Sequence, residues 1–155
     1  MKVFGKIENR TIYIDASGNL SYVAKGAIDC DGSDNRFHDP CWQADTSLHH
    51  NGRPIDAESV PYVVVPPLIL KGVKPVVLGC LAKIKIVGKL GTVECVVADV
   101  GPRRKLGELS CEAARRLGLD GNPNHGGTDE PIISYEIFPG IPAIIDGIRY
   151  KLQPS

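Results

Sequence analysis

The stretch CVVADVGPRRKLGELSCEAARRLGLDGNP, from Cys95 to Pro123, carries the clearest structural signals in the chain. It begins within the Val-rich run Val93–Val97, which is typical of a β-strand. A polar turn follows, and Cys111–Leu117 then predicts a short helix, because Ser110 stands at the N-cap position and Gly118 at the position where helices end. The stretch therefore predicts a strand, a tight turn and a helix in close succession.

The rest of the chain also favours β-structure. The 17 glycines and 12 prolines indicate many tight turns between short strands, and the turn Ala16–Asn19 predicts a hairpin. The other predicted strands are Thr11–Ile14, Tyr22–Ala24, Tyr62–Val65, Val76–Leu81, Ile84–Val87 and Ile132–Phe138. We expect a mainly β fold, a β-rich α+β chain with one short helix.

Length and charge narrow the class of protein. With 155 residues, 43% of them hydrophobic, the chain can form one domain, with an N-terminal lobe over about residues 1–60 and a barrel-like lobe over about 61–155. The formal net charge is zero, which argues against a nucleic-acid partner. The longest apolar run, Tyr62–Leu70, is too short to span a membrane. We therefore expect a monomer without a membrane or nucleic-acid partner.

The long segment Ile28–Pro61 shows little hydrophobic periodicity and is predicted to be an ordered loop. Between Asp29 and Glu58 acidic residues outnumber basic ones, whereas Lys71–Arg116 is rich in lysine and arginine. This asymmetry indicates either a cationic ligand near the acidic loop or only a solvated face.

The five cysteines include no CxxC pair, so a zinc site is not expected. Two disulfides and one free thiol fit the count better. Cys30 with Cys41 would close the acidic loop, and Cys80 with Cys95 would join two strands. Buried reduced thiols are the alternative.

Two resemblances follow from these residues. The stretch Cys95–Pro123 resembles the strand, Asp-x-Gly-Pro turn and Ala-rich helix of double-psi β-barrel proteins, especially the septal lytic transglycosylase and expansin group. That likeness implies a double-psi-like β-barrel more than it implies a substrate.

The second resemblance covers more of the chain, from about Ile28 to Gly140. The motifs are Asp29-Cys30-Asp31-Gly32, Tyr62-Val63-Val64-Val65-Pro66, Asp99, Gly107-Glu108 and Tyr135-Glu136-Ile137-Phe138-Pro139-Gly140. In this order they resemble the fungal-type endo-chitosanases of glycoside hydrolase family 75. The resemblance implies inverting hydrolysis of chitosan, with the catalytic carboxylates at Asp99 and Glu108. The connection Val100–Leu106 departs from the longer loop of the fungal members.

Glycoside hydrolysis itself requires such a pair of acids. One carboxyl group protonates the leaving oxygen, and the other activates water or attacks the sugar carbon. Asp99 ends a predicted strand and Glu108 opens the next element, so both can lie at one mouth of a barrel. A turn cap is the alternative role for Asp99, and a helix-entry charge is the alternative for Glu108. The higher reference pKa of glutamate favours Glu108 as the acid and Asp99 as the base, whereas the transglycosylase likeness favours the opposite assignment.

The acidic loop supplies candidate contacts to substrate. Asp29, Asp31 and Asp34 could bind the ammonium groups of glucosamine, or they could stabilise the loop as Asx turns. A calcium loop is not favoured, because Asp34 stands where an EF-hand needs glycine. We expect no metal and no cofactor.

Trp42 and His125 are further candidates for substrate binding. Trp42 could stack on a sugar face or pack on a disulfide. His125 resembles the histidine that follows the helix in the chitosanase family, or it is a solvent-exposed loop residue.

Two other functions share these features. A peptidoglycan lytic transglycosylase would need Asp99 but not Glu108. An expansin-like carbohydrate-binding barrel would need a row of exposed aromatic residues, and this chain has only nine aromatic residues. Chitosan lies outside cells, so we expect a secreted protein, although MKVFGKIENR at the N-terminus has no apolar signal segment.

Overall fold

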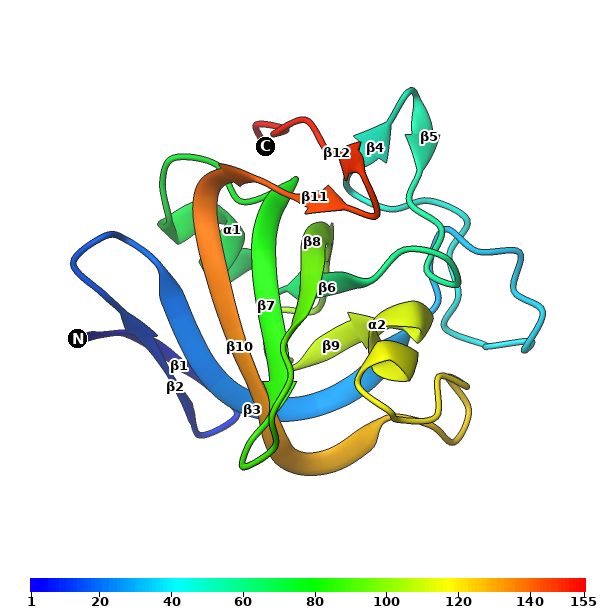
Figure 1. The fold of residues 1–155 in the computed structure, drawn as a ribbon, viewed down its shortest axis with the longest axis horizontal. Coiled ribbons are helices and arrows are strands. Elements are labelled where there is room, and N and C mark those ends of the chain that lie inside the picture. Colours follow the sequence, from blue (N-terminus) through cyan, green and yellow to red (C-terminus); the bar gives the residue numbers. More distant parts are fainter.

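Six strands close into a barrel at the centre of the molecule (Figure 1). The computed structural model describes residues 1–155, of which 43% lie in strands and 8% in helices. The strands are β1 (Lys2–Ile7), β2 (Arg10–Ile14), β3 (Leu20–Asp29), β4 (His49–His50), β5 (Arg53–Pro54), β6 (Tyr62–Val65), β7 (Cys80–Ile86), β8 (Val93–Val100), β9 (Glu108–Ser110), β10 (Thr128–Pro142), β11 (Ile144–Ile145) and β12 (Ile148–Arg149), and the helices are α1 (Pro67–Gly72) and α2 (Cys111–Arg116). This architecture confirms the predicted mainly β, barrel-like fold.

The barrel runs in the order β3-β10-β7-β8-β6-β9, and β9 pairs with β3 to close it. The pairs β6–β8 and β3–β9 are parallel, and the other four pairs of the barrel are antiparallel. The hairpin β1–β2 extends the sheet beyond β3, on the side of the molecule away from the long loop that follows β3 (Figure 1). Because β3 comes from the first 60 residues and the other barrel strands from the rest, both expected lobes contribute to one barrel.

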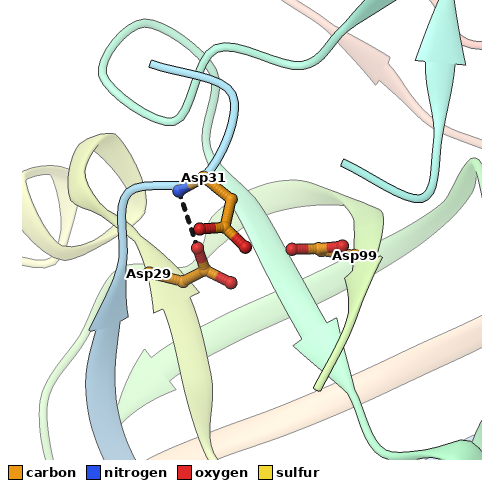
Figure 2. Close-up of side chains that lie close together, drawn as sticks. All are labelled: Asp29, Asp31 and Asp99. Atoms are coloured by element: carbon orange, nitrogen blue, oxygen red, sulfur yellow. Dashed lines mark hydrogen bonds between the residues drawn. The ribbon is translucent and has the colours of Figure 1, made fainter. Parts of the chain in front are cut away.

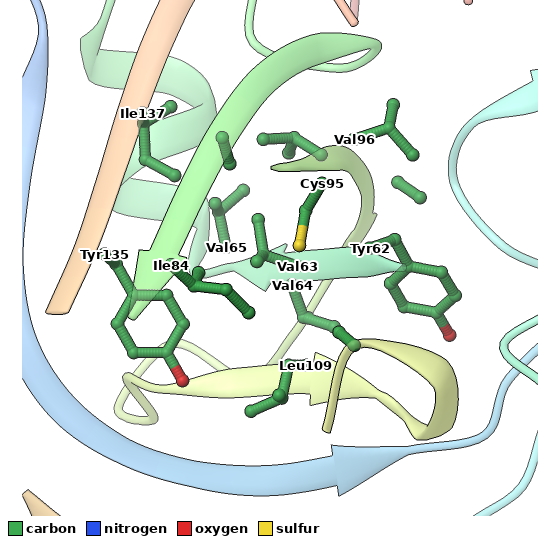
Figure 3. Packing of buried hydrophobic residues seen from close by; sticks show 14 of the residues in the cluster. Tyr62, Val63, Val64, Val65, Ile84, Cys95, Val96, Leu109, Tyr135 and Ile137 are labelled. Atoms are coloured by element: carbon green, nitrogen blue, oxygen red, sulfur yellow. The ribbon is translucent and has the colours of Figure 1, made fainter. Parts of the chain in front are cut away.

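The interior is a single apolar cluster of 35 buried residues. Figure 3 shows the packing around β6, all four residues of which are buried. Strands β8 and β9 pair with its two edges. Burial of each such side chain stabilises the fold by about 1.5–3 kcal/mol. The core therefore fixes the positions of the neighbouring strands β8 and β9, which carry Asp99 and Glu108.

The predicted hairpin is confirmed, since Tyr13 and Ile14 pair with Ser21 and Leu20 in antiparallel register. The predicted helix is confirmed as α2, and the Ser110 hydroxyl caps it by accepting a hydrogen bond from the Ala113 N–H at 3.1 Å. None of the helices has the length and apolar character needed to span a membrane.

The predicted secondary structure differs from the observed one in several places. The runs Val76–Leu81 and Ile84–Val87 are not two strands, because a single strand, β7, covers Cys80–Ile86 and the residues 76–79 lie before it. The prediction of one helix missed α1, which begins at Pro67, because proline in the first turn is compatible with a helix. Strand β1 was not predicted at all, and it is held by pairing with β2.

The predicted cysteine pairs were also wrong. The disulfide joins Cys30 to Cys111, 81 residues apart, while Cys41, Cys80 and Cys95 are free thiols. Cys95 lies opposite Ala82 in the β7–β8 register, so the partner expected for it, Cys80, is displaced along the strand. Cys41 lies exposed in the loop without a disulfide, because its expected partner, Cys30, is buried and faces α2 instead.

Candidate functional site

Neighbouring barrel strands bring Asp99 and Glu108 to the same level of the sheet. Val64 of β6 is paired with Asp99 of β8 on one side and with Glu108 of β9 on the other. Residues paired across strands project to the same face of a sheet, and two strand spacings correspond to about 9.6 Å. The two carboxyl groups therefore lie on the same face of the sheet, on the two strands that flank β6.

Asp29 lies on this same face. Ala27 of β3 is paired with Glu108, and Asp29 is two residues further along β3, so its side chain projects to the same side. Tyr62 is two residues before Val64 on β6, and its hydroxyl lies 3.2 Å from Asp29 Oδ1 and 3.0 Å from the Asp31 carbonyl oxygen, both of which accept from it.

The carboxyl groups of Asp29, Asp31 and Asp99 form a tight group, shown in Figure 2. One oxygen of each lies within 4.8 Å of the others. Oδ1 of Asp29 accepts a hydrogen bond from the Asp31 N–H at 2.7 Å, and Oδ1 of Asp31 accepts one from the Gln43 N–H at 2.9 Å. No other three His, Cys, Asp or Glu side chains gather in this way. A group of acids alone does not define a metal site, so we assign none.

Burial and mutual repulsion set the protonation of these acids. Burial raises the pKa of Asp29 to about 8, and the neighbouring Asp31 charge adds to the increase. Burial also raises the pKa of Asp31 to about 7, with a further contribution from Asp99. Because carboxylates so close together cannot all ionise at little cost, the group retains protons near neutral pH.

Glu108 has a different environment from the aspartates. Its side chain is buried, and this burial raises its pKa, with Asp99 acting in the same direction. The Lys105 ammonium, 3.4 Å from Glu108 Oε1, acts in the opposite direction. Burial therefore favours the protonated form of Glu108, whereas the neighbouring Lys105 ammonium favours its ionised form.

Two glycines shape this geometry. A methyl group at Gly101 would overlap Glu108 Oε2, so another residue there would displace that carboxyl group from its place beside the end of β8. Gly107 has φ of +93°, which lets the chain turn sharply into β9. Gly101 and Gly107 thus have a steric role around Glu108.

The other predicted site residues lie elsewhere. Asp34 is exposed and accepts a hydrogen bond from the Arg36 N–H, as an Asx turn does. The Trp42 indole N–H donates to the Ser33 carbonyl at 3.0 Å, so the ring helps to order the loop. His125 pairs with Asp120 at 3.2 Å, and its side chain is 67% exposed. None of these three side chains has a hydrogen bond or ion pair with the carboxyl groups of Asp29, Asp31, Asp99 or Glu108.

Sequence reasoning missed Ser47 and Lys105 and gave Tyr62 no role of its own. Ser47 donates to Asp99 from both its backbone N–H and its hydroxyl, each at 3.1 Å. Nothing in the local sequence marks this serine, because its partner is 52 residues away. Lys105 could have been identified from its spacing of three residues from Glu108.

A scan against known protein families found no match for this chain, and no curated protein matched it. The fold and the site define the molecule as a small closed β-barrel with four carboxyl groups gathered on one face of its wall.

Proposed function

We propose that the protein is an endo-acting chitosanase that hydrolyses β-1,4 bonds between glucosamine units with inversion of configuration. The observation that carries the proposal is the placement of Asp99 and Glu108 on either side of Val64. Inverting glycosidases hold their two carboxyl groups about 6.5–9.5 Å apart, which leaves room for a water molecule. Two strand spacings, about 9.6 Å between the strand backbones, correspond to the upper limit of that range.

Glu108 is assigned as the general acid and Asp99 as the general base. Burial raises the pKa of Glu108, which favours the protonated form that a general acid needs. Asp99 accepts two hydrogen bonds from Ser47, which hold it as a hydrogen-bond acceptor, the role that a general base needs. The two environments thus separate the roles of two similar groups.

The reaction proceeds by a single displacement. Glu108 transfers its proton to the glycosidic oxygen as the bond from that oxygen to the anomeric carbon breaks. Asp99 removes a proton from a water molecule, whose oxygen forms a bond to the anomeric carbon from the opposite face. Solvent then returns a proton to Glu108 and accepts the proton from Asp99, so the enzyme is regenerated.

The acids beside the pair suit a cationic polymer. Asp29 and Asp31 border Asp99, and an ammonium group nearby would favour their ionised forms and form charge-assisted hydrogen bonds with them. The lactyl carboxylate of peptidoglycan would instead meet like charge on this face. The same chemistry and the disulfide are compatible with action outside cells, so we propose that the protein is secreted.

A reducing-end assay on highly deacetylated chitosan tests the proposal, with chitin and peptidoglycan assayed in parallel. Wild type should cut chitosan, and Asp99→Asn and Glu108→Gln should each lower kcat/KM by at least about a hundredfold. Glu94→Gln is the matched control, because Glu94 lies exposed on the same strand as Asp99. Proton NMR of the first products should show the inverted anomer.

Several results would overturn the proposal. Intact chitosan after incubation with folded wild type excludes a chitosanase. Full activity in Glu108→Gln excludes the two-carboxylate mechanism, and release of anhydro-sugar ends from peptidoglycan identifies a lytic transglycosylase instead.

A further inference from the structure

Asp99 is held by a segment that belongs to neither barrel strand beside it. Both hydrogen bonds from Ser47, one from its backbone N–H and one from its hydroxyl, end on Asp99 Oδ1 at 3.1 Å. Concentrating both donors on one oxygen fixes the plane of the carboxyl group and leaves Oδ2 for other partners. Asp99 itself is only 7% exposed, so water cannot easily replace these donors.

The C-terminal segment holds Ser47 in place. The Gln153 side-chain N–H donates to the Ser47 carbonyl oxygen at 2.7 Å, and the Gln153 side-chain oxygen accepts from the His49 N–H at 3.0 Å. The Leu48 N–H donates to the Ala98 carbonyl at 2.9 Å, beside Asp99. The Gln153 N–H is in turn fixed to the Leu78 carbonyl at 3.0 Å. Contacts from Gln153 and Ala98 therefore hold the segment that donates to Asp99 Oδ1.

Acidic groups surround Asp99 on its other sides. Asp29 on β3, Asp31 after it and Glu108 on β9 all face Asp99, and the charge of Asp99 raises the pKa of each of them. From β6, the Tyr62 hydroxyl faces the same group. The charged groups on the Ser47 segment itself, Asp45 and His49, are exposed and paired with each other at 2.6 Å. Ser47 holds Asp99 through two hydrogen bonds, and the protonated carboxyl group of Asp31 also forms one with it.

We propose that Ser47, held by Gln153, is a positioning residue that orients Asp99 as the general base. The inference rests on the proposed function for its kinetic consequences, but the orientation of Asp99 can be observed without any substrate. Without the Ser47 hydroxyl, Asp99 Oδ1 would keep only the backbone N–H of residue 47 as a donor from this segment.

Two measurements on the folded full-length chain test the proposal. The first reads the Asp99 side-chain rotamer by NMR three-bond couplings, without any substrate. Wild type and Ser47→Thr should each show a single rotamer, whereas the couplings of Ser47→Ala should be averaged over more than one. Gln153→Ala should show the same averaging to a smaller degree.

The second measurement is the kinetics of chitosan cleavage. In Ser47→Ala kcat should fall about tenfold with KM little changed, and Ser47→Thr should restore most of the lost kcat. Ser59→Ala is the matched control, because its hydroxyl also donates to an aspartate, Asp56, at 3.1 Å, but on an exposed part of the loop. It should leave both measurements unchanged.

A single, unchanged Asp99 rotamer in folded Ser47→Ala would overturn the proposal. If Ser47→Ala does not fold, the same result in Gln153→Ala would overturn it. Failure of wild type to cut chitosan would overturn the proposed function alone, because the NMR couplings would still decide whether Ser47 orients Asp99.

Discussion

Adjacent residues of β9 belong to two contrasting regions of the molecule. Leu109 is fully buried in the apolar core (Figure 3), whereas Glu108 points to the face that carries Asp29, Asp31 and Asp99. Burial of the apolar region stabilises the fold. Burial of the acidic region opposes folding, because it removes water from groups that repel one another when ionised. The apolar core of the barrel therefore stabilises the fold, and the buried carboxyl groups reduce that stability.

The largest expected effect concerns the covalent bond between the two acid-bearing segments. Cys30 directly follows Asp29, and Cys111 lies three residues after Glu108, so the disulfide holds these segments together against their repulsion. Because it closes a loop of about 80 residues, the double variant Cys30→Ala/Cys111→Ala should lose about 4 kcal/mol of unfolding free energy. Urea denaturation measures this loss. The control Cys41→Ala removes an exposed free thiol and should leave stability unchanged.

The next effect tests the apolar side of β9. Leu109→Ala leaves a cavity in the core and should lower the free energy of unfolding by about 3 kcal/mol. Leu90→Ala, at a fully exposed position, should change it by less than about 0.5 kcal/mol. Equal effects of the two variants in urea denaturation would contradict the contrast between core and surface.

A smaller effect of opposite sign is expected on the acidic side. Asp29→Asn keeps an oxygen that can accept from the Asp31 N–H and the Tyr62 hydroxyl but removes a charge that burial disfavours. At pH 8 the variant should therefore be more stable than wild type by about 1–2 kcal/mol. Thermal denaturation should show a melting temperature higher by about 3–6 °C. Asp129→Asn, at an exposed position, is the control, and a lower melting temperature of Asp29→Asn would contradict the interpretation.

The pH dependence of this gain sharpens the contrast. Burial raises the pKa of Asp29 from 3.8 to about 8, so the folded chain retains a proton that the unfolded chain releases between those values. Stability contributed by this proton is complete below about pH 4 and is lost as the pH rises towards 8. The advantage of Asp29→Asn should therefore be absent at pH 4 and grow up to pH 8, as measured by the melting temperature at each pH. An advantage that is constant with pH would contradict it.

Part of the site could be predicted from the sequence. The motif around Asp99 and Glu108 indicated two acids at one mouth of a barrel, and the register of β6 with β8 and β9 places both beside Val64. Asp29 and Asp31 were predicted as site residues of a polar loop, and the structure brings their carboxyl groups against that of Asp99. Asp34 carried the same signal but lies in a turn of its own, because an exposed Asx turn and a site carboxylate look alike in sequence.

The sequence by itself determined what depends on near neighbours: the strand segments rich in Val and Ile, the Ser110-capped helix and the separation of acidic from basic segments. The tertiary structure alone decided the disulfide partner of Cys30, the meeting of Tyr62 with Asp29 and the hold of Ser47 on Asp99. These contacts join residues between 33 and 81 positions apart. Local propensity acts over a few residues, whereas such contacts depend on strand register and on closure of the barrel, which only the packing of the whole chain fixes.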